Sequence, residues 1–359
     1  MIPSANPSIG DEEKRRVEAV MDSGMLAEGE VVEEFEAEFA DYCGVDRGLA
    51  TTNGTTALHA ALVGLDVGEG DRVLTTPFSF VATANAARLA GAEVYFVDVD
   101  PRTYNIDPDA LEARLRAGEQ VDAVIAVHLY GLPADVERLV ELADEYDFRL
   151  LEDAAQAHGA RCDGERVGSF GDAACFSFYP TKNMTTGEGG MILTDDEAVA
   201  ERARRFVDHG RTSGYEHASV GHNFRMTNLA AAIGRVQLDR LPEFTSARQR
   251  NAARLTERLS DVPDVVTPHE PDGYEHVYHQ YTVRVTDRDA LQTHLANHDI
   301  GTGVYYPIPI HRQPAYEDVS GSYPVAEACA EEVLSLPVHP ELDESDLDQI
   351  AEATAGAIV

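Results

Sequence analysis

Lysine is almost absent from this sequence, and one of the two lysines lies where it could do chemistry. Lys182 occupies the stretch SFYPTKNMTTGEGGMILT, between two turn-rich segments, and Lys14 is the only other lysine among 359 residues. A lysine amine acts as a nucleophile or a base when its surroundings lower its pKa. Lys14 lies in the amphipathic segment EEKRRVEAVM, where an ordinary exposed lysine is an equally good explanation. The neighbourhood of Lys182 therefore decides whether Lys182 is functional.

A carboxylate ends one of the apolar segments. Asp153 closes RLLED, and Gln156 and His158 follow it on the same turn. Burying a carboxylate at the end of a strand is costly unless a positive group lies beside it. That group could be a structural arginine, a metal ion or a protonated heterocycle. A metal is the weakest of the three, because this turn has no complete ligand set nearby.

Two further segments could hold an anion and a flat ring. In NGTTALHAAL a helix begins whose free N–H groups favour an anion, and Thr55 and Thr56 can add hydroxyl donors. An ordinary N-cap explains the same residues. Phe80, at a helix start in PFSFVATANAA, is either a core aromatic or a stacking surface. A phosphate cradle, a ring stack, a partner for a ring nitrogen and a lysine nucleophile are together the parts of a pyridoxal phosphate site.

The order of the predicted elements brings these residues to one edge of a sheet. From residue 48 to 195, short apolar runs alternate with helical patterns, which indicates a mostly parallel sheet covered on both faces. Ligands bind such sheets beyond the carboxyl ends of the strands. DAACFSF and GGMILT predict two more strands, joined by the lysine turn. We expect an α/β fold whose large domain, residues 1–240, has N-terminal helices and a mostly parallel mixed sheet.

The rest of the chain predicts a smaller domain. RMTNLAAAIGRVQLDRL has the apolar spacing of a core helix. Beyond about residue 260, HVYHQYTVRV and GTGVYYPIPI are predicted strands, DRDALQTHLANHD is a predicted helix, and a C-terminal helix follows Asp343. These elements predict an α+β domain over residues 241–359.

The charge balance limits the partners. Asp and Glu number 64 against 28 Lys and Arg, a formal net charge of -36. So acidic a surface repels nucleic acid and anionic lipid, and neither is expected as a partner. The balance resembles that of proteins from salt-loving archaea, in which concentrated salt screens the like charges. We therefore expect a halophilic protein.

Neither a membrane segment nor a disulfide framework is predicted. The sequence has no apolar run long enough to span a bilayer and no recognisable secretory leader, so a cytoplasmic location is expected. Four dispersed cysteines have no metal-ligand or redox spacing, so we expect buried, inert thiols and no metal site.

Several longer motifs resemble one enzyme family over nearly the whole chain. The motifs are NGTTALHAAL, PFSFVATANA, EDAAQAHGA, FSFYPTKN with GEGG, GHNFRMTNLAAAIGRVQL and YYPIPIHRQPAY. They resemble the DegT/DnrJ family of pyridoxal-phosphate-dependent sugar aminotransferases, which has the aspartate-aminotransferase-like fold, called fold type I. The lysine segment and NFRMTNLAAAIG are the most specific of them.

The resemblance implies a role for each matching residue. Lys182 would carry the cofactor covalently and then move the proton during the reaction. Asp153 would pair with the ring nitrogen, Gln156 would lie at the ring hydroxyl, and Phe80 would stack on the ring. The remaining implied roles are phosphate binding by Thr55, Thr56 and Ser177, phosphate binding in the neighbouring subunit by Asn223, and substrate contact by His158, Tyr305, Tyr306 and His311. A homodimer with shared active sites would follow.

The implied reaction moves an amino group, with glutamate as the expected donor, to the keto carbon of a nucleotide-linked hexose for amino-sugar and glycan biosynthesis. Transamination is favoured because this sequence has Lys182, whereas dehydratases of the family have histidine there. Two alternatives stay open: a non-catalytic regulatory or assembly protein, and a pyridoxal enzyme that acts on free amino acids. Whether the keto group lies at carbon 3 or carbon 4 also stays open.

Overall fold

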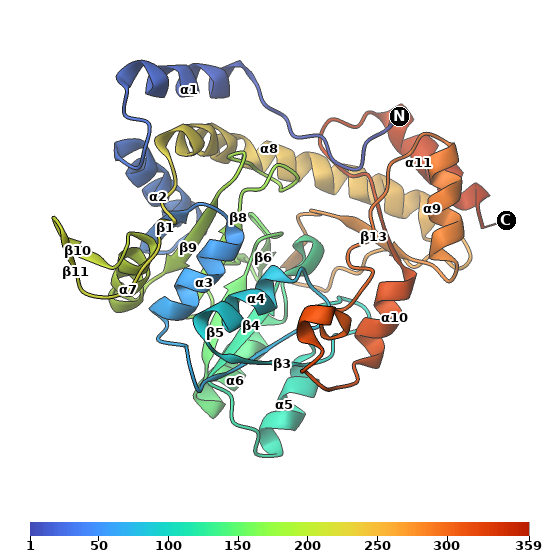
Figure 1. Cartoon of the computed structure of the whole chain (residues 1–359). Coiled ribbons are helices and arrows are strands. Elements are labelled where there is room, and N and C mark those ends of the chain that lie inside the picture. The colour runs from blue at the N-terminus through green and yellow to red at the C-terminus, as the bar shows by residue number, and fades with distance from the viewer. Residues whose placement is uncertain (359) are drawn as a thin grey trace.

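The centre of the molecule is a seven-stranded sheet (Figure 1). The computed structural model describes residues 1–358. The strand order is β1 (Arg47–Thr51), β9 (Gly190–Thr194), β8 (Ala173–Ser177), β5 (Arg149–Asp153), β4 (Ala123–Val127), β2 (Arg72–Thr75) and β3 (Glu93–Phe96). β9 runs antiparallel to both of its neighbours, and the other adjacent pairs are parallel. The predicted mostly parallel mixed sheet of fold type I is confirmed.

Helices cover both faces of this sheet because its strands are apolar on both sides. In β4 every residue is buried: Ile125 packs in the core beneath α3 (Gly54–Gly64), α4 (Ala82–Ala90) and α7 (Glu197–Val207), whereas Val124 packs in the opposite core beneath α5 (Pro108–Arg116) and α6 (Val136–Tyr146). Successive side chains of a strand point to opposite faces. The continuous apolar runs of the sequence therefore become the middle layer of a three-layer domain.

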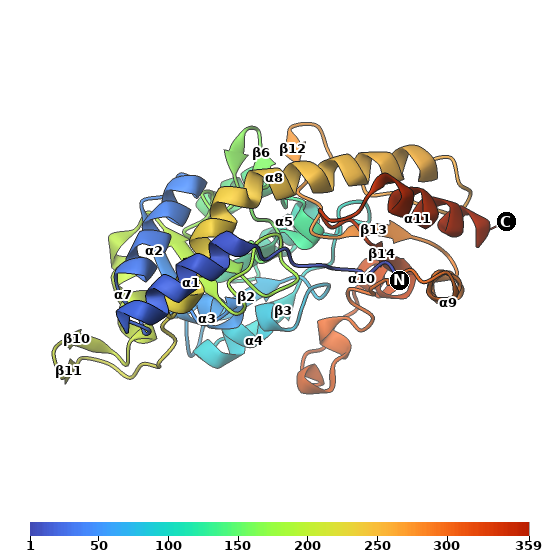
Figure 2. The same ribbon diagram turned by 90° about the horizontal axis from the view of Figure 1, so that it is seen from above.

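Further helices pack on the sheet near its β1 edge. α2 (Glu30–Cys43) and the first part of α8 (Asn228–Leu259) pack on the β8 and β9 side of the sheet. α1 (Asp11–Ser23) lies across α8 in both views (Figures 1 and 2). The hairpin of β10 (Arg211–Ser213) and β11 (Glu216–His217) projects from the same end.

A second core forms at the far end of α8. The antiparallel pair β13 (Tyr281–Arg284) and β14 (Val333–Leu336) packs with α9 (Arg288–Asn297), α11 (Glu344–Gly356) and the last turns of α8. Ile2 also packs in this core and pairs with Ile300, so the N-terminal segment crosses from α1 to this end (Figure 2). The boundary that we predicted at residue 240 lies inside α8, which runs unbroken from one core to the other.

The structure differs from the sequence prediction after residue 300. GTGVYYPIPI is not a strand: only an isolated bridge, Gly303 to Ser335, forms there. Pro307 and Pro309 lack the N–H groups that a sheet needs. The strand of this region is instead β14, which the sequence analysis missed. Residues 310–333, including α10 (Pro324–Glu332) and short 3₁₀ turns, pack on the large core.

The remaining elements are short. β6 (Arg161–Cys162), β7 (Glu165–Arg166) and β12 (Tyr274–Glu275) form a small separate sheet. Within residues 1–358, no helix combines the length and the apolar character that crossing a bilayer requires. All four cysteines are free and buried, as the sequence analysis predicted.

Candidate active site

Lys182 lies in the turn between β8 and β9, at the rim of the sheet. Its N–H donates to the Tyr179 carbonyl over 2.9 Å, and the next side chain, Asn183, donates to the Val277 carbonyl over 3.0 Å. These bonds fix the turn from both sides. Lys182 is half-buried, and burial lowers its pKa to about 8, although the Asp153 carboxylate acts in the opposite direction. A substantial neutral fraction of this amine therefore exists near neutral pH.

Asp153 ends β5 and is 5% exposed. One carboxylate oxygen accepts from the Thr83 hydroxyl over 2.7 Å, and the other accepts from the Ala155 N–H over 3.3 Å. Burial raises the pKa of Asp153 above its ordinary value, while Thr83, Ala155 and the charge of Lys182 partly oppose that rise. The carboxylate has no directly bonded cation in the described part of the chain, so it has capacity for a positive partner.

The residue before Asp153 has a different environment. Glu152 points to the opposite face, where His128 donates to it over 3.0 Å and the N–H groups of residues 168, 170 and 171 donate over 2.8–2.9 Å. Burial alone would raise the pKa of Glu152, but these donors bring it below its usual value. Glu152 is a fully satisfied structural carboxylate, and the sequence analysis did not single it out.

Three side chains surround the space in front of Asp153. Gln156 accepts from the Tyr130 N–H over 2.7 Å and donates to the Tyr306 hydroxyl over 3.0 Å. Phe80 is 55% exposed, and its ring lies 5.9 Å from that of Tyr306. An aromatic ring left so exposed beside a buried polar group offers a face to a flat ligand. Tyr306 thus brings the C-terminal part of the chain to this edge of the sheet.

The first turn of α3 closes on the end of β8. A Cβ on Gly54 would lie 2.8 Å from the Ser177 Cβ, so only glycine permits this approach. The Thr56 hydroxyl bonds to Asn53 within a capping box, which agrees with the ordinary N-cap explanation for that residue. Thr55 and Ser177 have no side-chain hydrogen bond within residues 1–358 and remain available as donors. The two lie at the N-terminus of α3, where free N–H groups favour an anion.

Asn223 is exposed on the segment that leads into α8, and its backbone pairs with Asp208. The following residues join the end of β1, because the Thr52 N–H donates to the Phe224 carbonyl over 2.8 Å. The side chain of Asn223 bonds to no other group of the described chain, so it is free to reach another molecule.

The predicted substrate residues separate into two groups. The Tyr305 carbonyl accepts from the Tyr130 hydroxyl, and its ring meets that of Tyr306, next to the site. His158 and His311 are instead buried away from solvent. His158 packs against Phe176 and Phe178, with a pKa that burial lowers to about 3, and His311 bonds to Glu327 over 2.9 Å. The structure does not place either histidine where it could face a substrate.

The comparisons with known proteins agree with this geometry. The profile of the DegT/DnrJ/EryC1/StrS aminotransferase family matches residues 7–355. A pleiotropic regulatory protein of Geobacillus stearothermophilus is 44% identical over 347 residues, which cover 95% of this chain and 93% of that protein. UDP-N-acetyl-3-dehydro-alpha-D-glucosamine 3-aminotransferase of Acidithiobacillus ferrooxidans is 40% identical over 334 residues, which cover 92% of this chain and 90% of that protein. The chain belongs to this aminotransferase family.

A solved structure gives the same result for the fold. DesV of S. venezuelae superposes on this chain with a TM-score of 0.93 at 37% identity. The matched residues cover 97% of this chain and 94% of the DesV chain. The present protein is therefore a pyridoxal-phosphate-dependent aminotransferase, as the motifs predicted.

The residues of this site fit this cofactor. Asp153 offers a buried carboxylate to a protonated ring nitrogen, Phe80 offers a ring face, and Thr55 with Ser177 offers donors to a phosphate. When bound, pyridoxal phosphate supplies a carbon that captures amines and a ring that accepts electrons. The amine of Lys182, with its lowered pKa, can take up and return a proton at its Nζ atom.

Two residues of this site escaped the sequence analysis. Thr83 holds Asp153, and Tyr130 holds Gln156 through its N–H. Thr83 follows Phe80 by three residues, which places the two on one side of a helical turn, so its position was a usable signal. Tyr130 has a left-handed backbone, with φ of 60°, and nothing in its sequence context indicated that.

Proposed function

We propose that this aminotransferase moves an amino group from glutamate to the keto carbon of a nucleotide-linked hexose. The observation that carries the proposal is the nearness of Lys182, whose pKa is lowered to about 8, to a buried Asp153 that has no bonded cation among residues 1–358. The relative from A. ferrooxidans is named for transfer to carbon 3 of a UDP-linked keto-sugar, which supports a nucleotide-linked substrate. Keto-sugars of this kind are precursors of amino sugars for glycans.

Each residue has a stated task in this proposal. Lys182 holds the cofactor and moves a proton, Asp153 keeps a proton on the ring nitrogen, and Gln156 donates to the ring hydroxyl. Phe80 keeps the ring in place by stacking. Thr55 and Ser177 bind the phosphate, Thr56 holds the start of α3 beside them through its capping box, and Tyr305 contacts the substrate.

Product analysis tests the substrate class directly. Purified holoenzyme is incubated with glutamate and, separately, with UDP-, dTDP- and GDP-linked 3-keto and 4-keto hexoses, and mass spectrometry detects the amino sugar and 2-oxoglutarate. We expect amination of at least one keto-sugar nucleotide and none of the same sugars without the nucleotide. Turnover of free α-keto acids alone, with every sugar nucleotide inert, would favour the alternative enzyme that acts on free amino acids.

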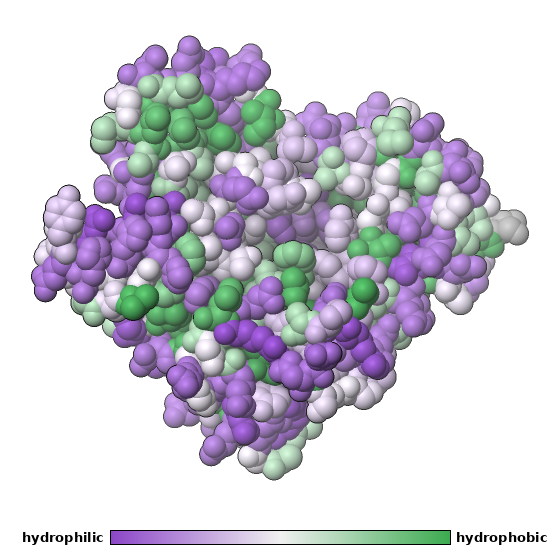
Figure 3. Space-filling view, viewed as in Figure 1, coloured by the Kyte–Doolittle hydropathy of each residue, from purple (hydrophilic) through white to green (hydrophobic). Residues whose placement is uncertain are grey.

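We also propose that two copies of the chain share their active sites. Asn223 is exposed and bonds to no side chain of its own subunit among the described residues. Met21 in α1 and Met25 just after it are 63% and 65% exposed, and Figure 3 shows an apolar patch beside α1, one of several on this face. Such patches mark contact surfaces.

Complementation between subunits tests the shared site. Asn223→Ala and Lys182→Ala are each expected to inactivate the enzyme, whereas a mixture that exchanges subunits regains up to about half of the wild-type activity per heterodimer, because one of the two sites is intact. Labelled subunits and native mass spectrometry verify the exchange. Exchanged mixtures that remain inactive would refute shared sites.

The regulatory alternative has one observation in its favour, the name of the relative from G. stearothermophilus. Retention of Lys182, Asp153 and Gln156 favours catalysis, because a protein that only binds does not need them. Finding the biological effect of the gene undiminished in Lys182→Ala would support a regulatory role instead.

We further propose that the protein is adapted to concentrated salt. Its net charge of -36 destabilises the compact state by self-repulsion unless salt screens it. We expect the melting temperature and the activity to rise between 0.1 M and molar potassium chloride. Equal stability and full activity in dilute buffer would refute the adaptation.

A further inference from the structure

Behind the lysine turn lies a buried arginine that has no counter-charge among residues 1–358. Arg248 of α8 is 6% exposed, and burial lowers its pKa to about 10 with no carboxylate acting against that shift. One guanidinium nitrogen donates to the carbonyls of Tyr278 and His279, over 3.1 and 3.4 Å, while Nε has no partner within residues 1–358. A buried cation that lacks an anion costs several kcal/mol.

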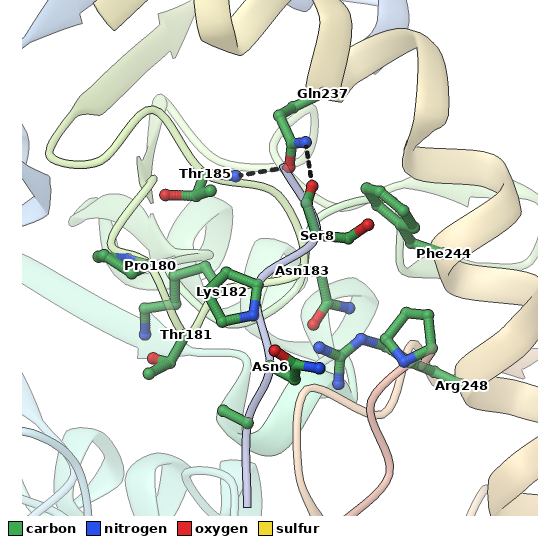
Figure 4. Close-up of a pocket in the computed structure, with 13 residues that line it drawn as sticks. Asn6, Ser8, Pro180, Thr181, Lys182, Asn183, Thr185, Gln237, Phe244 and Arg248 are labelled. Carbon is green, nitrogen blue, oxygen red and sulfur yellow. Dashed lines mark hydrogen bonds between the residues drawn. The ribbon is translucent and has the colours of Figure 1, made fainter. Parts of the chain in front are cut away.

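Arg248 lines a small cavity. The other walls are the lysine turn, with Lys182 and Asn183, and the N-terminal segment, with Asn6 and Ser8. Figure 4 shows Arg248 reaching from α8 toward the N-terminal segment, beside the lysine turn. The cavity has a volume of about 20 Å³, and a single water molecule needs roughly 10–15 Å³.

The surroundings are positive, although the exposed Asn6 leaves the cavity in contact with solvent. Burial and the charges of Lys182 and Arg248 lower the pKa values of His158 and His279, which lie nearby, so both histidines are neutral. The two neutral histidines thus do not offset the charge of Arg248. The Asp153 carboxylate does not offset it either, because it faces Thr83 on the sheet. A water molecule in the cavity could accept a hydrogen bond but would leave the charge uncompensated. A phosphate or a glutamate carboxylate with its chain is too large.

We propose that this cavity binds a monatomic anion, chloride in a chloride-rich medium, which accepts hydrogen bonds from Arg248 Nε and from the Asn6 amide. The anion neutralises the guanidinium and joins three segments that are far apart in sequence: the N-terminal segment, the lysine turn and α8. It is distinct from the proposed phosphate site beside α3, which other residues form. The site also gives salt a specific role besides screening the acidic surface.

Bromide replacement tests the site in the intact holoenzyme. Crystals are grown in potassium bromide, and anomalous differences at the bromine edge locate the halide. We expect a peak in the cavity within hydrogen-bonding reach of Arg248 Nε. Its absence, with only water density in the cavity at saturating bromide, would overturn the proposal whatever the variants do.

A chloride titration at constant ionic strength provides the solution test. Methanesulfonate, which is too large for the cavity, replaces chloride, and the melting temperature of the holoenzyme is recorded. We expect chloride to raise it saturably by roughly 5 °C in the wild type. Arg248→Gln should lose the saturable part, whereas Arg250→Gln, an exposed neighbour on the same helix, should keep it. Identical titrations for wild type and Arg248→Gln would contradict the proposal, and failure of that variant to fold leaves the bromide peak as the deciding result.

Discussion

Glu152 and Asp153 are neighbours at the end of β5, and the two carboxylates are buried almost equally, with exposures of 0% and 5%. Glu152 receives four hydrogen bonds, one from His128 and three from backbone N–H groups. Asp153 receives one from Thr83 and a longer one from the backbone. Their pKa values shift in opposite directions, downward for Glu152 and upward for Asp153.

Two neighbouring carboxylates therefore have different roles: Glu152 is structural, and Asp153 is suited to bind a cofactor. Burial raises the pKa of each carboxyl, and the number of donors decides which of the two still holds its charge easily. Glu152 uses its charge to fix the loop at residues 168–171. Asp153 keeps unused capacity beside Lys182, and that capacity is what a cationic ring requires. Substitutions of Lys182, Asp153 and Glu152 test this difference between the two carboxylates.

The largest expected effect is that of Lys182→Ala. The variant loses the only lysine near Asp153, so reduction with borohydride should fix no cofactor to the chain, and transamination should disappear. Intact mass spectrometry after reduction measures the attachment. Lys14→Ala, which removes an exposed lysine paired with Asp11 at 2.9 Å, is the matched control and should attach the cofactor fully. Labelled Lys182→Ala protein would refute the assignment.

Asp153→Asn should have the second-largest effect on activity. The amide cannot hold a proton on the ring nitrogen by its charge, so kcat should fall by roughly a hundredfold or more, while much of the cofactor stays bound. The free energy of unfolding of the apoprotein should change little, because the carboxylate that is lost accepted few hydrogen bonds. Steady-state kinetics and visible absorbance measure the two effects. Near-normal turnover would make Asp153 a structural residue like Glu152.

Glu152→Gln should show the reverse pattern. Replacing the charge that pairs with His128 should lower the free energy of unfolding by about 3 kcal/mol, with kcat changed far less than in Asp153→Asn. Because the pKa of Glu152 is lowered in the folded state, its contribution is present above the unfolded value of 4.5 and is lost as the pH falls through the folded value.

Denaturant unfolding at pH 7 and at pH 4 measures this contribution. The deficit of Glu152→Gln relative to wild type should shrink at the lower pH. Glu165→Gln, on the exposed strand β7, is the control and should match the wild type. An undiminished deficit at low pH would show that the charge of Glu152 is not the source.

The smallest effect is a pH dependence of cofactor capture. The neutral amine of Lys182 appears as the pH rises through its lowered pKa of about 8. The initial rate at which apoprotein captures pyridoxal phosphate should therefore increase by roughly tenfold between pH 7 and pH 9 and then level off. Stopped-flow absorbance follows the rate. A midpoint near 10.5, the ordinary value for lysine, would contradict the effect of burial.

Most elements of the large domain follow from local signals. The alternation of apolar runs and helical patterns predicted β1 to β5 and the helices between them, and the lysine turn was placed correctly between β8 and β9. The error came after residue 300, where YYPIPI has the apolar, aromatic composition of a strand. Two prolines remove its donors, and the partner of β13 is instead β14, about 50 residues later in the chain. Such pairing is non-local, and local composition does not reveal it.

The sequence by itself determined the class of fold and the cofactor, and it predicts Lys182 as the cofactor's lysine, because residue rarity, motif order and strand periodicity can all be read along the chain. It also marked Asp153, since a carboxylate after an apolar run needs a partner wherever that run is buried. Only the tertiary structure decided which polar groups are satisfied. Glu152 gains donors from residues 128 and 168–171, His158 and His311 are withdrawn into cores, and Arg248 is left without a counter-charge. These outcomes depend on distances between segments that are remote in sequence. A pKa is shifted, and a charge is left buried without a partner, only when those segments pack together in the folded chain.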